Sequence, residues 1–507
     1  MNKTDSLLIL VKSLTKAEKR YFRLWSNLQS GDKVYLSLFD LLDTHSSPDE
    51  IFERFEKEQG GKSFEMTAKH LYTVLMDCLL RLRKKQDVQT DICNKISKAS
   101  ILFERELFED AIDELNKAKR LAKDFEYDLL LQLIRRTELQ YLSALDFEGI
   151  NERELVNKQM KIQEVMKYSR NINLHVQLYD ILKHRLIYKG YARSDKQKED
   201  LNDLVLSELH LIANSSYRGF EAEKLHLLFQ ATYYLNSGNY KSAIRFYQEL
   251  ISLFEENKHL LLNPPIYYLS AIRGILDSLQ IAGIYREMPF FLSKLEEIEQ
   301  SDYATEFVLS VKVLRFNYES SRLIHTGEFK TAKELMRKAD ESLFRKKNLL
   351  GLEDQLKLHL GAAILYISTN EYTLARKSMK EVFSSGKLYY ALPSYKTARL
   401  VNLILQAELG NYDFFENEIE SIKRNIRYEK QSYITEKLVF KFVQAYPLPS
   451  YEKNRLKLWE QFRKDIQKIQ QSKYERQLLK TFDFLSWIES KLTREPFQNV
   501  LMNKIRS

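Results

Sequence analysis

The chain has 507 residues, of which 44% are hydrophobic, so it is long enough to bury a large core. It holds only 14 Gly and 8 Pro residues, about a third of the number that average composition gives. Tight hairpin turns need these residue types, so the composition excludes a protein built mainly of β-hairpins and predicts an all-α fold. The formal net charge of +9 is small for this length, and no apolar run approaches the roughly 18 residues of a membrane span.

Residues 1–90 predict an N-terminal helical module. Thr15 and Glu18 have the spacing of a capping box, and apolar residues at helical spacing follow them. Gly60-Gly61 separates two later helices, which leaves open a helix-turn-helix that binds DNA. The second of these helices has Cys78 on its apolar face, and it ends in a basic run of Arg81, Arg83, Lys84 and Lys85.

Residues 91–446 predict a series of helix-turn-helix units. A Gly or Asn recurs at near-equal steps, and a Tyr or Phe follows it two residues later each time. Both residue types tolerate the left-handed conformation that ends a helix. The five turn residues are Gly238, Gly283, Gly327, Asn370 and Gly410. Glu106 and Leu145 begin weaker matches upstream, and the stretch around Gly190 has no clean match.

The unit around Gly238 resembles the tetratricopeptide-repeat signature. The resemblance rests on the spacing of Ala231, Tyr234, Gly238, Tyr240, Ala243, Tyr247 and Leu250, and it covers roughly residues 95–445. The steps of 40 to 45 residues are longer than the family's usual period of about 34. The resemblance implies a superhelical solenoid of antiparallel helix pairs, with a concave groove lined by the first helix of each unit.

The resemblance also implies which side chains face that groove. They are Thr232, Asn236, Arg273, Asp277, Asn317, Ser321, Leu360 and Ile364. This mixture of polar and apolar residues suits an extended or helical peptide segment. An alternative stays open, in which these side chains only solvate the inner wall.

Residues 447–507 follow a break at Pro447 and Pro449 and predict two long helices. The first carries Trp459 and Phe462 at helical spacing, and the second carries Leu478, Phe482, Leu485, Ile488 and Leu492. The last unit of a solenoid exposes an apolar face, so we expect these helices to cap it. Self-association through the near-heptad stripe of the first helix is the alternative.

The sequence contains none of the common catalytic, phosphate-binding or metal-binding motifs. Glu223 and His226 have the Glu-x-x-His spacing of di-iron bundles, but no second pair accompanies them. We therefore expect no metal and no cofactor, and a cytoplasmic scaffold that binds a protein or peptide rather than an enzyme or a membrane protein. The alternative is a transcriptional regulator, in which the N-terminal module contacts DNA and the repeats act as a sensor.

Overall fold

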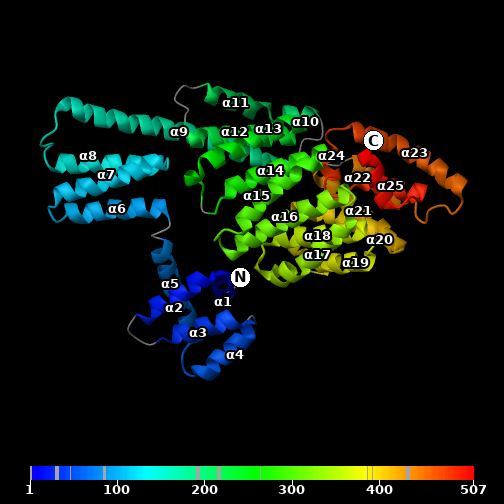
Figure 1. Ribbon diagram of the computed structural model, residues 1–507, viewed down its shortest axis with the longest axis horizontal. Coiled ribbons are helices and arrows are strands. Elements are labelled where there is room, and N and C mark those ends of the chain that lie inside the picture. The colour runs from blue at the N-terminus through cyan, green and yellow to red at the C-terminus, as the bar shows by residue number, and fades with distance from the viewer. Residues whose placement is uncertain are drawn as a thin grey trace.

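The fold is built of helices throughout the part of the chain that can be described (Figure 1). The computed structural model describes residues 3–28, 33–45, 47–83, 87–189, 195–213, 219–262, 264–384, 386–390, 392–429 and 434–506. These residues form 26 α-helices and five short 3₁₀-helices, with no strand among them. The predicted all-α class is therefore confirmed.

Residues 7–79 have a hydrophobic core of their own. Its buried side chains include Phe22, Phe39, Phe55 and Cys78, each inaccessible to solvent. Five helices build this N-terminal module: α1 (Lys3–Ser13), α2 (Lys16–Asn27), α3 (Val34–Thr44), α4 (Pro48–Glu58) and α5 (Phe64–Arg83). The module lies below the rest of the molecule in Figure 1, and α5 leads out of it.

The next four helices project from the main body at the left of Figure 1. They are α6 (Val88–Phe103), α7 (Phe108–Asp124), α8 (Asp128–Ala144) and the long α9 (Glu152–Lys189). Their core is small and uses Ala99, Ala111 and Ala118, whose short side chains let α6 and α7 lie close together. The far end of α9 joins the main body, where Leu182 is fully buried.

The main body is built of the helices that follow, and from α12 onward each helix packs beside the next one in the chain (Figure 1). These are α10 (Asp195–Glu199), α11 (Asn202–Ile212), α12 (Phe220–Asn236), α13 (Tyr240–Glu256), α14 (Ile266–Ala282), α15 (Met288–Glu299), α16 (Thr305–His325), α17 (Phe329–Ser342), α18 (Leu352–Ser368), α19 (Tyr372–Ser384), α20 (Pro393–Glu408) and α21 (Phe415–Glu429). Gly274 allows α14 to approach α13, because a Cβ atom there would lie 2.1 Å from the ring of Tyr247.

The predicted turn residues do end helices. Gly238, Gly283, Gly327, Asn370 and Gly410 have φ angles of 80°, 76°, 79°, 61° and 76°. These values lie in the left-handed region that Gly and Asn adopt most easily, so the turn prediction is confirmed. Glu106 and Phe147 are left-handed as well. Gly190, where the sequence has no clean match, lies outside the described residues.

The C-terminal region contains α22 (Ile434–Val443), α23 (Glu452–Gln471), α24 (Arg476–Leu479), α25 (Phe484–Thr493) and α26 (Phe497–Arg506). The prediction of two long helices was wrong for the second one. Its residues divide between α24 and α25, because the Asp483 carboxylate accepts a hydrogen bond from the Ser486 amide (2.9 Å) and starts a new helix there. Trp487 and Phe462 pack around Phe442, in a core shared with helices α16 to α22. The division into three domains stays a prediction.

Candidate functional site

Seven of the eight predicted groove residues line one hollow of about 930 Å³. Six of them form pairs four residues apart on α14, α16 and α18. This spacing places both members of a pair on the same face of a helix. The pairs are Arg273 and Asp277, Asn317 and Ser321, and Leu360 and Ile364; Asn236 of α12 is the seventh. We call this surface the inner wall.

Thr232 does not line the hollow. It is half-buried on α12, and its side chain hydrogen bonds with Tyr179 of α9. Its carbonyl oxygen accepts a hydrogen bond from the Asn236 side chain at 2.6 Å. Thr232 lies away from the hollow because the long α9 packs against α12, and no feature of a repeat pattern could have indicated this.

Hydrogen bonds between neighbouring helices fix the inner wall. The Tyr318 hydroxyl of α16 donates to Asp277 Oδ1 of α14 at 2.9 Å. Gly361 of α18 leaves room for the Asn317 side chain, whose Oδ1 would lie 1.9 Å from a Cβ atom at that position. The Ser394 hydroxyl of α20 donates to Glu353 of α18 at 2.7 Å. Each helix of the wall is therefore held in register with the next.

A segment of the C-terminal region, residues 473–483, forms the other side of the hollow. Lys480 Nζ lies 2.8 Å from Asp277 Oδ1, and the Lys480 carbonyl accepts a hydrogen bond from Gln280 at 2.6 Å. The Gln477 side chain donates to the carbonyl of Leu235 at 3.1 Å. The inner wall therefore faces a second wall from the same chain, and the site is a bounded hollow.

Side chains of opposite charge lie close together around the hollow. Burial raises the pKa of Asp277, but the charges of Lys480 and Arg273 outweigh this, and the pKa lies below its usual value. Burial and the charge of Arg273 lower the pKa of Lys357, against the nearby Glu353. Lys357 Nζ lies 3.1 Å from Glu353 Oε1. The hollow thus offers both signs of charge to a ligand.

Three buried polar atoms of residues that line the hollow have no hydrogen-bond partner within the described part of the chain. They are Asn236 Oδ1, Ser320 Oγ and Gln477 Oε1, on side chains that are 4%, 3% and 6% exposed. Leaving a buried polar atom unpaired costs about 1–3 kcal/mol. The atoms have almost no accessible surface, so a ligand in the hollow could pair with them only after their side chains turned towards it.

The possible di-iron pair does not converge on one point. His226 Nδ1 lies 2.5 Å from Glu208 Oε1, whereas Glu223 is exposed and does not contact Glu208 or His226. Glu208 also accepts from Gln230 at 2.8 Å and lies 3.6 Å from His175 Nε2. No group of His, Cys, Asp and Glu among the described residues has a metal-binding arrangement. Glu208 therefore ties α9, α11 and α12 together.

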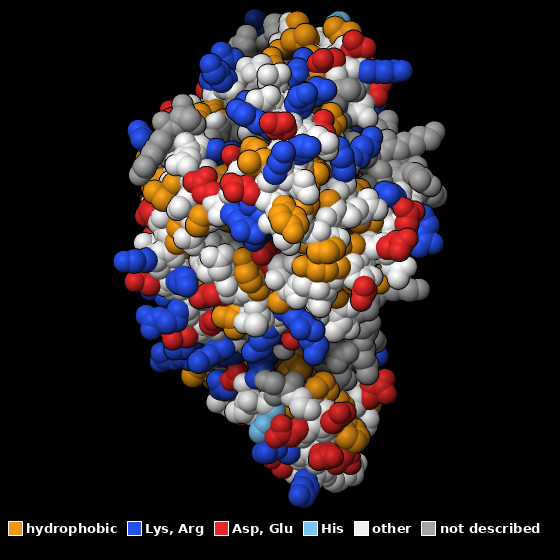
Figure 2. All heavy atoms as spheres, turned by 90° about the vertical axis from the view of Figure 1, so that its right-hand side faces the viewer, with side chains coloured by type: hydrophobic (Ala, Val, Ile, Leu, Met, Phe, Trp, Pro, Cys, Tyr) orange, Lys and Arg blue, Asp and Glu red, His pale blue; other side chains and the backbone are white. Residues whose placement is uncertain are grey.

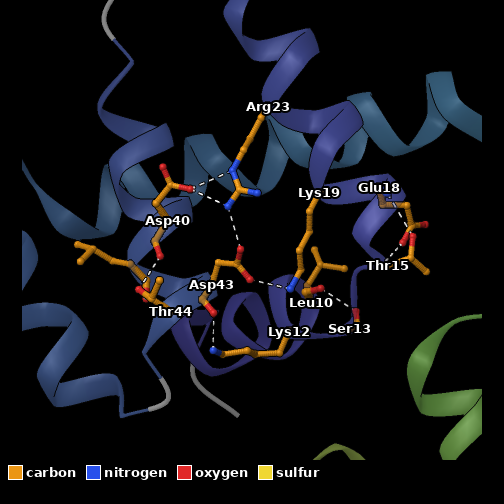
Figure 3. Close-up of polar contacts among 11 residues, drawn as sticks. Leu10, Lys12, Ser13, Thr15, Glu18, Lys19, Arg23, Asp40, Asp43 and Thr44 are labelled. Atoms are coloured by element: carbon orange, nitrogen blue, oxygen red, sulfur yellow. Dashed lines mark hydrogen bonds and ion pairs between the residues drawn. The ribbon is translucent and has the colours of Figure 1, made fainter.

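Three cations of α1 and α2, Lys12, Lys19 and Arg23, point towards Asp40 and Asp43 of α3 (Figure 3). Asp43 accepts hydrogen bonds from Lys19 at 2.6 Å and from Arg23 at 2.8 Å. Lys12 donates to the Asp43 carbonyl at 2.8 Å. The predicted capping box is present, with Glu18 N bonded to Thr15 Oγ1 at 3.2 Å. These three cations are therefore occupied within the module.

The exposed face of α5 carries both signs of charge. Glu65, Lys69, Tyr72, Thr73 and Asp77 are all exposed on it. The Arg81 guanidinium lies over the ring of Trp25 at 5.7 Å. Of the predicted basic run, Lys84 and Lys85 and the side chain of Arg83 lie outside the described residues. The described part of α5 gives no basic surface for DNA.

Sequence reasoning missed the C-terminal side of the hollow and part of the wall. Lys357 lies three and seven residues before Leu360 and Ile364, so helical spacing could have included it. Gln280, three residues after Asp277, could have been found in the same way. No sequence signal connects Lys480 with Asp277, because 203 positions separate them.

Comparison with known proteins gives no family for this all-α chain. No protein-family model matches the sequence, and no curated protein matches it. Within the described ranges, no helix is both long enough and apolar enough to span a membrane.

Proposed function

We propose that this chain is a scaffold that binds a protein or peptide partner in the hollow between the inner wall and residues 473–483. The observation that carries the proposal is the hollow of about 930 Å³, whose lining includes the charged side chains of Arg273, Asp277 and Lys357. The peptide groups and charged side chains of a partner can pair with these charged side chains. Leu360 and Ile364 add an apolar surface for a side chain.

The wider assignment belongs to the same proposal. The left-handed turns at near-equal spacing and the side-by-side helices support a solenoid of the tetratricopeptide-repeat type. In such a fold, binding uses the inner face of successive units, which is where the hollow lies. We propose no catalytic activity, and we place the protein in the cytoplasm on the expectation from its sequence.

A native pull-down with identification by mass spectrometry tests the binding function. The double variant Arg273→Ala/Asn317→Ala changes two half-buried or exposed side chains of the inner wall. The matched control is Lys330→Ala/Lys338→Ala, on the exposed face of α17. We expect a partner that the wild type and the control recover and the wall variant loses at least tenfold. Equal recovery by all three proteins would contradict the proposal.

The alternative of an N-terminal DNA-binding module has no structural observation in its favour. Lys12, Lys19 and Arg23 are paired within the module, and the exposed face of α5 is mixed in charge. We therefore do not propose it as a second function.

A further inference from the structure

Helices α22 and α23 share an exposed surface rich in lysine, which we call the lysine face. It contains Lys437 and Lys441 of α22 together with Lys453, Lys457, Lys464 and Lys468 of α23, all of them exposed. The two helices are in contact, because Lys441 Nζ lies 3.6 Å from Asp465 Oδ2 and 5.2 Å from the centre of the Phe462 ring. The six lysines therefore form one surface.

The packing of α23 determines which of its residues face outward. Arg455, Phe462, Ile466 and Ile469 are buried against the body of the molecule. The lysines lie opposite these residues, at steps of four, seven and four positions, and this spacing keeps them on one side of the helix. Glutamines 461, 467 and 471 are exposed between them. The face is therefore polar and basic along the whole helix.

Most of this charge has no ion-pair partner in the part of the chain that the structure describes. Elsewhere on the surface, ion pairs such as Lys333–Glu371 and Lys347–Glu381 neutralise lysines at 2.8 and 2.7 Å. On the lysine face only Lys441 has an ion pair among the described residues. Between Lys453 and Lys468, the acidic side chains of α23 are Asp465, which pairs with Lys441, and Glu460. Figure 2 faces the side of the molecule where α23 lies in Figure 1, and its upper part shows several Lys and Arg side chains with acidic and hydrophobic ones among them.

We propose that the lysine face binds the phosphate backbone of a nucleic acid. Lys453 to Lys468 span about 22 Å of helix at 1.5 Å per residue. Duplex DNA presents one negative charge per roughly 1.7 Å of its axis, so about 13 phosphates lie along that length. Lysine and glutamine side chains can donate to phosphate oxygens without reading the bases. The site therefore binds without sequence specificity.

The composition of the face favours a nucleic acid over a lipid surface. Helices that lie in a membrane interface insert apolar side chains such as Trp, Phe and Leu between their basic residues. On the lysine face the intervening residues are glutamines and Glu460, and Leu456, which is 46% exposed, is the one large apolar side chain exposed on α23. Phosphatidylserine vesicles therefore serve as the comparison ligand in the test. The proposal is independent of the hollow, and each site can fail without the other.

Fluorescence anisotropy on the full chain tests the proposal with two labelled probes, a DNA duplex of about 20 base pairs and a single-stranded RNA of about 20 nucleotides, at roughly 50 to 200 mM salt. The test variant is Lys457→Gln/Lys464→Gln/Lys468→Gln. The control is Lys330→Gln/Lys338→Gln/Lys346→Gln, three exposed lysines of α17 and the following 3₁₀-helix (Phe344–Leu349). Both triple variants lower the net charge by the same amount. Circular dichroism checks that each variant is folded.

We expect the wild type and the control to bind one or both probes. In the test variant, affinity should fall more than tenfold, and the slope of log affinity against log salt should decrease by about three. The duplex and RNA arms identify which nucleic acid is preferred. Three results would overturn the proposal: no binding to either probe at about 50 mM salt, equal weakening in both triple variants, or binding to phosphatidylserine vesicles alone.

Discussion

Lys480 Nζ lies 2.8 Å from Asp277 Oδ1, and this contact joins the C-terminal segment to the inner wall across the hollow. The two side chains are 18% and 13% exposed, so water screens the pair only weakly. Asp277 also accepts a hydrogen bond from Tyr318, which fixes its carboxylate on the wall. The contact therefore sets the distance between the two sides of the proposed binding site.

Replacing Lys480 with Gln should destabilise the closed hollow. Asp277 would then lose its main counter-charge while it stays buried, and breaking a buried pair of this kind costs about 3 kcal/mol. Urea denaturation measures the free energy of unfolding. The matched control is Lys473→Gln, because its pair with Asp195 is 45% and 78% exposed and water screens it. If both variants lost the same free energy of unfolding, the pair of Lys480 and Asp277 would be no stronger than the exposed pair, which would contradict the prediction.

Acid should destabilise the protein through His175. Burial lowers the pKa of this residue from 6.5 to about 4, so the folded protein holds it neutral. The unfolded chain takes up the proton below pH 6.5, and stability is therefore lost as the pH falls from 6.5 towards 4, by at most about 3 kcal/mol. Urea midpoints measured across this range should fall less steeply in His175→Gln. The same slope in both proteins would contradict the assignment.

Gly274→Ala should weaken the contact between α13 and α14. The new Cβ atom would lie 2.1 Å from the Tyr247 ring, and Tyr247 is only 5% exposed. Forcing a packed ring to move costs about 1–3 kcal/mol, which a thermal melt detects. Gly351→Ala is the control, because no atom lies within 4 Å of a Cβ at that position. If Gly274→Ala and Gly351→Ala had the same melting temperature, the close packing of α13 against α14 would be disproved.

Two helices begin on a carboxylate from a distant part of the chain, and removing either carboxylate should loosen its helix. Glu475 accepts from the amides of Ile434 and Thr435 at 2.8 and 3.0 Å. Glu126 accepts from the amides of Phe220 and Glu221 at 3.0 Å each. Losing such a cap costs about 1–2 kcal/mol.

Hydrogen exchange in Glu475→Ala and Glu126→Ala measures this effect. Each variant should lose amide protection in the first turn of its own helix, α22 or α12, and keep it in the other. Each variant is thus the control for the other. Unchanged protection in both helices would contradict the capping role.

Asp43→Asn should loosen the first three helices. Burial raises the pKa of Asp43, but the hydrogen bonds from Lys19 and Arg23 lower it by more. The pKa therefore lies below its usual value. The ionised carboxylate therefore contributes stability above about pH 4, and this contribution is lost as the pH falls through the folded pKa. Hydrogen exchange of residues 3–27 should accelerate by about tenfold at neutral pH. Asp40→Asn is the control, because Asp40 is 58% exposed and should change exchange little.

Much of the fold could be predicted from local signals. The scarcity of Gly and Pro indicated long helices, and the recurring Gly or Asn indicated where they end. Both signals act within a few residues, since a left-handed turn depends on the residue that adopts it. The second C-terminal helix was predicted wrongly, because Asp483 starts a new helix inside a stretch whose apolar spacing continues without a break.

Local signals likewise predict one part of the candidate site and not the other. The sequence by itself determined that the two members of each pair on α14, α16 and α18 share one helix face, because residues four apart do so whatever surrounds them. Only the tertiary structure decided that α9 covers Thr232 and that residues 473–483 close the hollow. Those contacts join parts of the chain as much as 203 positions apart, as with Lys480 and Asp277. Local spacing carries no information about such pairs, because they form only when the whole chain has packed.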